Sequence, residues 1–488
     1  MSAPVTGGAP PTRPGPTTRD PAHVPLLLTL AAVVLSHALQ ISDGHFQVAA
    51  LRWLTLTLLA CVAAFALPRR WGRRLPPQAL PVALGLGLAA QFVQLARQPP
   101  GIYPDIVWPD AYAPYVVGLG IAAALVVAGL ADARRLRRVW FPALLLVQLA
   151  LGAWVIRHAP APPIDVFVFQ QEGSAALLRG ENPYTLTFPN IYGDGAYYGP
   201  GLDHDGRLAF GFPYPPLSLF LALPSYLLAG DHRYAQLLAL ALAGALLALA
   251  RPGRVGALAA ALLLFSPRVF FVLEQGWTEP FLILLLALVV ACACRWPRAL
   301  PVAFGLLLAV KQTLVFAPLT AFLLVGEVVG GVVGSRGRWR DWWRLVWRAG
   351  GVALAISLPL ALWNVRGFVV SVVTLQLYQP LRPDALSYVA WLARANLPAP
   401  GWLAFAAIVP ACALALWRGA RTPAGFAAAM ALIYLTFFAF NKQAFCNYYF
   451  FALGALCAAI AATHPVASPS LGPRSQTNAV NSATVTRS

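Results

Sequence analysis

The chain has 488 residues, of which 59% are hydrophobic and only 11% are charged, and its formal net charge is +18. A soluble domain carries roughly 25% charged residues, and several apolar runs here exceed the roughly 18 residues that favour a membrane helix. This composition excludes a water-soluble globular protein. It also argues against a nucleic-acid-binding protein, because the basic residues form short clusters between apolar runs. Such clusters are typical of the residues that orient membrane helices.

The hydropathy pattern, taken in chain order, predicts an all-α polytopic membrane protein with about 13–14 transmembrane helices. It leaves open whether the two pieces between 299 and 330 are full crossings or short, broken helices. The expected spans are 24–40, 50–67, 80–96, 113–131, 139–156, 231–250, 255–273, 278–294, 299–311, 313–330, 349–364, 401–417, 424–440 and 446–463.

The charge of the loops predicts the orientation of these spans. Most of the basic residues fall in alternate loops, and the positive-inside rule places those loops in the cytoplasm. Both termini are then cytoplasmic, with residues 1–23 and 464–488 as disordered tails of a cell-membrane protein. The basic clusters in these loops are Arg69, Arg70, Arg73, Arg74, Arg134, Arg135, Arg137, Arg138, Arg251, Arg254, Arg295, Arg298, Arg336, Arg338, Arg340, Arg344, Arg348, Arg418 and Arg421.

The apolar stretch 213–229 does not fit this scheme as a span. Counting it as a crossing would move Arg251 and Arg254 outside and invert every later loop. Its prolines also disfavour a continuous helix. We therefore expect it to be interfacial or re-entrant at the outer face.

The outer face holds most of the acidic residues and the longest loops, about 157–230 and 365–400. Long ordered loops usually carry function. The sequence therefore predicts a functional site on the outer side of the membrane.

The most informative segment follows the fifth span at once. Residues 165–179 fit one interfacial helix, with Asp165 in its first turn and Phe169 and Glu172 on the same face. A carboxylate at the lipid boundary can have a raised pKa and act as a general base. The alternative is an aspartate that only caps the helix.

Three further features have both a functional and a structural interpretation. The turn around Tyr214 and the outer hairpin with Gln275 and Glu279 could bind a substrate, or could simply form a turn and a helix cap. The two lysines, Lys311 and Lys442, lie at outer ends of spans, where an ammonium is costly unless it meets an anion such as a phosphate or snorkels to the headgroups.

Two patterns that suggest metal binding are given a structural interpretation. The acidic triplet at 203–205 is expected to be a solvated loop. The six cysteines show no spaced metal motif and are expected to be packing residues. They are Cys61, Cys292, Cys294, Cys412, Cys446 and Cys457.

The order of these segments resembles the GT-C superfamily of polytopic glycosyltransferases, and most of all glycosyltransferase family 87, the polyprenyl-phosphate-mannose-dependent α-mannosyltransferases. The resemblance covers residues 139–463, which would form the glycosyltransferase core after four additional helices in 24–138. The matching segments are Asp165 with Gly180-Glu181-Asn182-Pro183-Tyr184, Tyr214-Pro215-Pro216-Leu217, Glu274-Gln275…Glu279, and Leu307…Lys311.

The resemblance implies a membrane enzyme that transfers a hexose, mannose in the family, from a polyprenyl-phosphate donor to an envelope glycolipid or glycan. In the superfamily an acidic residue after the first core span is the catalytic base, which here is Asp165. Lys311, Lys442 and Arg382 are candidates to stabilise the departing phosphate. The remaining candidates for substrate binding are Gln275, Glu279, Glu172, Tyr184 and Tyr214.

The scheme requires neither a metal nor a cofactor, and its partners are membrane lipids, the donor and the acceptor. Phe169 stands where the family pattern suggests a tyrosine. The alternative function is a transporter or lipid flippase, for which charged groups in mid-span and two repeated halves are expected. An inactive transferase-like scaffold is a third possibility.

Overall fold

The structure is a computed structural model that describes residues 21–68, 70–71, 75–107, 110–193, 197–325 and 335–463. The two expected tails therefore lie almost wholly outside the described residues. The chain is mostly helical, at 73%, and forms a polytopic bundle. Among the described residues, seven helices are long and apolar enough to cross a membrane, and shorter apolar helices pack among them.

The first half of the bundle follows the expected spans closely. Each helix occupies a predicted apolar run to within a few residues. These helices are α1 (His23–Ser42), α2 (Val48–Ala66), α3 (Ala79–Arg97), α4 (Ala113–Leu130), α5 (Trp140–His158) and α8 (Arg233–Ala250).

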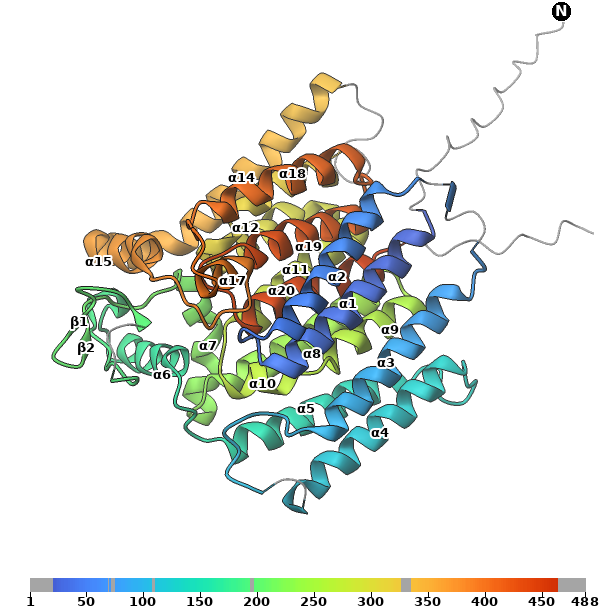
Figure 1. Cartoon of the computed structure of the whole chain (residues 1–488), viewed down its shortest axis with the longest axis horizontal. Coiled ribbons are helices and arrows are strands. Elements are labelled where there is room, and N and C mark those ends of the chain that lie inside the picture. The colour runs from blue at the N-terminus through green and yellow to red at the C-terminus, as the bar shows by residue number, and fades with distance from the viewer. Residues whose placement is uncertain are drawn as a thin grey trace, which may run out of the picture.

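The segment between α5 and α8 forms a cap at the end of the bundle that the loop charges assign to the outer face, and we call it the outer cap (Figure 1). Its elements are α6 (Asp165–Leu178), the hairpin β1 (Asp203–His204) and β2 (Arg207–Leu208), and α7 (Pro216–Ala229). Later in the chain α15 (Val365–Val369), α16 (Leu375–Tyr378) and α17 (Tyr388–Arg394) lie at the same end of the molecule. A second hydrophobic cluster, around Phe188 and Phe212, joins α6, the hairpin region and α7 to the end of α14 (Ser335–Trp363).

The second half departs from a simple series of spans at two points. The expected span 255–273 is interrupted, and forms α9 (Arg254–Leu264) and α10 (Val269–Glu274). Pro267 explains the break, because it lacks an N–H and disfavours a helical residue before it. The 299–330 region is broken too, since Lys311 is extended (φ −155°, ψ 135°) between α12 (Leu300–Val310) and three short helical segments, Gln312–Phe316, α13 (Ala317–Thr320) and Ala321–Leu324.

The remaining helices complete the bundle. They are α11 (Glu279–Arg295), α18 (Leu403–Arg418), α19 (Pro423–Ala439) and α20 (Cys446–Ala461). The expected span 349–364 is too short, because α14 already begins at Ser335 and includes the segment rich in arginine and tryptophan before 349.

Basic side chains of the predicted cytoplasmic loops gather at one end of the bundle, which we call the arginine end. Arg418 Nη2 donates to the carbonyl of Ala66 at 3.0 Å, Arg251 Nε donates to that of Ala462 at 3.2 Å, and Arg295 Nη1 donates to that of Leu249 at 3.3 Å. Each acceptor lies at a helix C-terminus, where cations are favourable. The loops that the positive-inside rule assigned to one side therefore also lie together in space, at the end opposite the outer cap.

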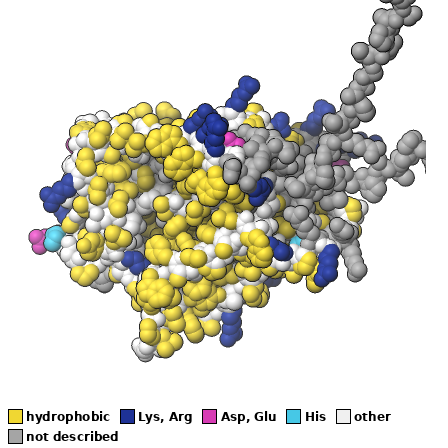
Figure 2. Space-filling model, turned by 90° about the horizontal axis from the view of Figure 1, so that it is seen from above, with side chains coloured by type: hydrophobic (Ala, Val, Ile, Leu, Met, Phe, Trp, Pro, Cys, Tyr) yellow, Lys and Arg dark blue, Asp and Glu magenta, His cyan; other side chains and the backbone are white. Residues whose placement is uncertain are grey.

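The outer surface of the bundle is strongly apolar. Large side chains such as Leu86, Leu146, Val409 and Trp417 are 66–80% exposed. In Figure 2 hydrophobic side chains cover much of the visible face, with Lys and Arg in scattered groups. A soluble monomer rarely exposes apolar surface on this scale, so the surface supports a membrane protein.

The four N-terminal helices pack against the helices of 139–463. Helix α1 contacts α20, α2 contacts α18 and α19, and α3 contacts α9. At the outer end Leu386 N donates to the carbonyl of Gly44 at 3.2 Å, and Phe46 N donates to that of Asp384 at 2.7 Å. The loop between α1 and α2 is therefore joined to the loop before α17.

This junction predicts the effect of two matched substitutions. Gly44 and Gly206 have the same left-handed backbone (φ +78° and +75°), but an added Cβ would lie 2.0 Å from the backbone nitrogen of Cys446 at Gly44 and in open space at Gly206. Gly206→Ala should lose only the conformational cost, about 1–2 kcal/mol. Gly44→Ala should lose about 1–3 kcal/mol more through overpacking. Thermal unfolding of both variants measures the difference, and equal losses would contradict the close packing of Gly44 against Cys446.

Candidate functional site

The outer cap and the bundle enclose a cavity of about 360 Å³, which we call the outer cavity. Its lining comes from segments far apart in sequence. Its polar and aromatic residues include Asp43, His45, Tyr103, Asp165, Tyr192, Tyr197, Tyr198, Tyr214, Gln275, Trp277, Lys311, Gln312, Arg382, Asp384, Gln443, Asn447 and Tyr448. Of the predicted site residues, the structure therefore brings together Asp165, Gln275, Lys311, Tyr214 and Arg382.

Asp165 is the first residue of α6, since Ile164 before it is extended (φ −137°, ψ 138°). The prolines at 160, 162 and 163 disfavour a helical backbone in the residues that precede them. Val166 N donates to Oδ1 at 2.7 Å, and the Tyr198 hydroxyl donates to Oδ2 at 3.2 Å. A carboxylate has about four acceptor positions, so each oxygen can still accept another hydrogen bond. The side chain keeps some exposure, and its accessible surface faces the cavity.

The pKa of Asp165 is raised above that of an ordinary aspartate. The main cause is burial, which withdraws the carboxylate from water. The hydrogen bonds from Val166 and Tyr198 and the positive charge of Arg382 oppose this effect without cancelling it. The arrangement is that of a carboxylate whose affinity for a proton has been increased.

Aromatic rings form the wall beside Asp165. Tyr192 and Tyr197 stack with their ring centroids 4.7 Å apart, and Tyr198 packs against Phe210 at 5.9 Å. Burial and the negative charge of Asp165 raise the pKa of both Tyr192 and Tyr198. These hydroxyls therefore stay protonated and can donate hydrogen bonds.

Arg382 also lines the cavity and contacts this wall through Tyr197. Its Nε and Nη2 donate to Asp384 at 2.8 and 2.6 Å. Its guanidinium also lies over the rings of Tyr197, at 4.3 Å, and Phe445, at 5.0 Å. Nη1 makes no hydrogen bond to the residues that the structure describes, so this group can still bind an anion.

Lys311 has an anionic partner within the protein. Its Nζ lies 2.5 Å from Glu279 Oε1, which also accepts from Asn447 Nδ2 at 3.2 Å. The rings of Tyr214 and Tyr448 flank the ammonium at 5.4 Å each. Sequence reasoning inferred a phosphate from the need for an anion, but Glu279 meets that need.

The other predicted binding residues lie outside the cavity lining. Tyr184 is buried behind it and donates to the carbonyl of Tyr214 at 2.7 Å. Lys442 donates to the carbonyls of Leu377 at 3.1 Å and Gln379 at 2.5 Å, and so braces one wall. Glu172 is exposed, although Phe169 on the same helix is buried.

The N-terminal helices also contribute to the outer cavity, which sequence reasoning did not foresee. Asp43 and His45 come from the loop after α1, and Ile102 and Tyr103 from the loop after α3. Glu274 holds the second loop, because its carboxylate accepts from the N–H groups of Ile102 and Tyr103 at 2.9 and 2.7 Å. The sequence contained one signal of this contribution, because the acidic residues Asp43 and Glu274 lie at the outer ends of expected spans.

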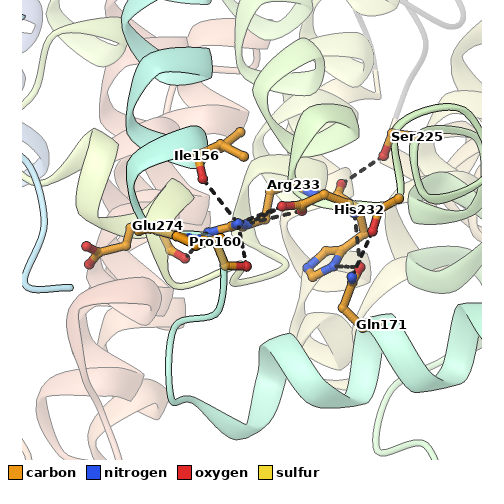
Figure 3. Close-up of polar contacts among 10 residues, drawn as sticks. Ile156, Pro160, Gln171, Ser225, His232, Arg233 and Glu274 are labelled. Carbon is orange, nitrogen blue, oxygen red and sulfur yellow. Dashed lines mark hydrogen bonds and ion pairs between the residues drawn. The ribbon is translucent and has the colours of Figure 1, made fainter. Parts of the chain in front are cut away.

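Arg233 was also missed, although it is an arginine at the outer end of a span, where positive charge is disfavoured. It is fully buried (Figure 3) and pairs with Asp231 at 2.6 Å. Nη1 donates to the carbonyls of Ala159 at 2.7 Å and Glu274 at 3.1 Å. Arg233 thereby joins the ends of α5 and α10 to the start of α8.

The contacts of Arg233 continue through its neighbour His232 to α6, and we call this network the hub (Figure 3). Its backbone N–H lies 3.2 Å and its Nδ1 2.8 Å from Gln171 Oε1, and Gln171 Nε2 donates to the carbonyl of Gly230 at 2.9 Å. Asp165 lies between two fixed points, the end of α5 held by Arg233 and the body of α6 held by His232. The hub therefore positions the carboxylate in the cavity.

The triplet at 203–205 lies on the hairpin of the outer cap and does not line the cavity. Asp203 Oδ2 accepts from Asn190 Nδ2 at 2.8 Å, while His204 and Asp205 are exposed. Among the described residues there is no group of three or more His, Cys, Asp or Glu side chains that could hold a metal ion.

No family model, no curated protein and no solved structure matches the chain. The geometry of the outer cavity therefore carries the functional argument.

The pairing of Lys311 with Glu279 predicts a double-mutant result. Glu279→Gln leaves a buried ammonium without its counter-charge and should reduce the free energy of unfolding by about 3–5 kcal/mol. Glu279→Gln combined with Lys311→Met removes both charges and should recover most of that loss. Unfolding of the purified variants in detergent measures both effects. A double variant no more stable than Glu279→Gln alone would show that the pair is not the source of the loss.

Proposed function

We propose that the chain is a membrane glycosyltransferase that moves a hexose from a polyprenyl-phosphate donor to an envelope glycolipid or glycan at the outer face. One observation carries the proposal. Three described carboxylates line the outer cavity, and two of them are in salt bridges, Asp43 with Arg268 and Asp384 with Arg382. Asp165 has no salt bridge with a residue that the structure describes, so it is the carboxylate available for chemistry.

The chemistry needs one base and one anion-binding group. The acceptor hydroxyl gives its proton to Asp165 as its oxygen attacks the anomeric carbon, and the bond from that carbon to the phosphate oxygen breaks. The electron pair leaves with the polyprenyl phosphate, where the Nη1 group of Arg382 can stabilise the developing charge. Mannose is the hexose that the resemblance to glycosyltransferase family 87 favours.

The lining of the outer cavity also suits a lipid-linked donor. Gln312 and Thr313 line the cavity, and Val315, two residues further along, is 67% exposed on the apolar outer surface of the bundle. A polyprenyl chain can therefore remain in the lipid beside the 312–324 segment while its phosphate enters the cavity. A phosphate that stays at one face in this way favours a transferase over a flippase, because a flippase has to carry the charged group across the membrane.

Asp165→Asn tests the base directly. General-base catalysis contributes about 10²–10⁴-fold, so transfer of labelled mannose from a polyprenyl-phosphate-mannose probe into extracted lipids or glycans should fall by that factor. Glu181→Gln is the matched control, because Glu181 is an exposed carboxylate in the same segment and, among the described residues, forms a salt bridge only with Arg179. Undiminished transfer by Asp165→Asn would refute the base role, and movement of the probe across proteoliposomes without transfer would favour the flippase.

The stability of Asp165→Asn separates this loss from misfolding. Because the pKa of Asp165 is raised in the folded protein, protonation stabilises the folded state, and that stability is lost as the pH rises through the folded pKa. Asparagine avoids the cost of burying the charge and can keep both hydrogen bonds. The variant should therefore unfold at the same or a higher temperature than the wild type at neutral pH.

The pH dependence of transfer gives an independent prediction. The base must be deprotonated, so the rate falls as the pH falls through the pKa of Asp165. The positive charge of Arg382 lowers that pKa, and Arg382→Gln should therefore move the acid limb of the pH–rate profile to higher pH. Tyr198→Phe removes a hydrogen bond with the same effect on the pKa and should move the limb in the same direction. An unmoved limb in both variants would assign it to another group.

A further inference from the structure

A second cavity lies at the arginine end of the bundle, opposite the outer cavity, and we call it the basal cavity. It has a volume of about 430 Å³ and forms where the ends of five helices meet. Representative lining residues are His23 of α1, Phe65 of α2, Arg418 of α18, Gly425 of α19 and Thr463 after α20. None of these takes part in the proposed transfer.

His23 is the unexplained group in this cavity. Only 5% of the residue is exposed, and both of its ring nitrogens lack a hydrogen-bond partner among the residues that the structure describes. Buried polar groups are nearly always paired, because an unsatisfied one carries the full penalty of its desolvation. An imidazole on the wall of a cavity without a protein partner points to a ligand that supplies one.

The charge around His23 determines the kind of ligand. Arg418 is fixed at the rim by hydrogen bonds to the carbonyls of Phe65 at 3.3 Å and Ala66 at 3.0 Å. Helices α1 and α19 begin at the cavity while α2, α18 and α20 end there, so the helix dipoles largely oppose one another and the Arg418 guanidinium sets the charge. No carboxylate occurs among the described lining residues. The field therefore favours an anion.

The rest of the lining is apolar. Leu28, Ala64 and Ala428 form the inner wall, and Trp417 at the rim is 80% exposed, as tryptophans at a membrane interface are. A free phosphate would leave this apolar wall unused. A phosphate that carries acyl chains would use both parts.

We propose that the basal cavity binds the phosphodiester headgroup of an anionic glycerophospholipid. The phosphate accepts from the His23 imidazole and the Arg418 guanidinium, and the glycerol and upper acyl chains lie along the apolar wall. Basic cavities between membrane helices bind anionic headgroups by this combination. Because the cavity joins α1 and α2 to α18–α20, the bound lipid fastens the N-terminal helices to the rest of the bundle.

The test is a lipid titration of the purified full-length chain in detergent, with thermal unfolding as the readout. Phosphatidylglycerol should raise the unfolding temperature of the wild type more than phosphatidylcholine does, because only a ligand that binds the folded state stabilises it. His23→Phe keeps the ring volume and removes the nitrogens, and Arg418→Gln removes the charge. Each should need about tenfold more phosphatidylglycerol for the same shift, the effect of losing one hydrogen bond to a charged group.

Two controls keep the result specific. Arg298→Gln removes an exposed arginine at the same end of the bundle that does not line the cavity, and it should titrate as the wild type does. Arg418→Lys restores the charge and should recover most of the response.

Three outcomes would overturn the proposal. Unchanged titrations for both His23→Phe and Arg418→Gln would remove the site. An equal shift with inorganic phosphate would show that no lipid is needed. A marked loss of stability of His23→Phe in phosphatidylcholine alone would show that the imidazole has a protein partner.

Discussion

A charge in an apolar bundle must find a partner, and this constraint organises both ends of the molecule. At the arginine end the cations reach helix C-terminal carbonyls, as Arg418 does at α2 and Arg251 at α20. At the outer end the buried cations are held by acids, with Arg233 on Asp231 and Lys311 on Glu279. Removing either partner of such a buried pair is costly, so these pairs fix how the helices meet.

Asp165 stands out against this pattern. Its carboxylate is enclosed by tyrosines and backbone and has no salt bridge with a described residue, although Arg382 is near. Its pKa is raised because burial withdraws it from water. An available, desolvated carboxylate is unfavourable for stability and useful for proton transfer. The hub of Arg233 and His232 holds α6 in place, so the carboxylate can be kept where it is despite that cost. The rest of the outer cavity supplies what a sugar phosphate would need around such a base.

The sequence predicted the helices well, because long apolar runs give a strong signal. The charge of the loops also predicted which basic clusters lie on the same side, and the structure places those that it describes at one end of the bundle. Breaks inside apolar runs were harder to place, although Pro267 was a local signal for the division between α9 and α10. The segment 213–229 was set apart by loop charge, and the structure forms there the short helix α7, which contains Pro224.

The site was predictable only in part, for a physical reason. Asp165 could be found because its position depends on the local order of span, prolines and helix. The partner of Lys311 is Glu279, 32 residues away on another helix, and hydropathy does not encode which side chains meet. The same holds for the loops at 43–45 and 102–103, which reach the outer cavity through long-range packing. Arg233 was visible as an outer arginine, but its role depends on carbonyls from α5 and α10.

The most direct test of the central claim is an infrared pH titration of the protonated carboxyl band, taken as the difference between wild type and Asp165→Asn. We expect a band that is absent in the variant and that titrates above the value of about 3.9 for an unperturbed aspartate. A band that titrates at or below that value would mean that Asp165 is an ordinary ionised carboxylate. The outer cavity would then lack the base on which the proposed transfer depends.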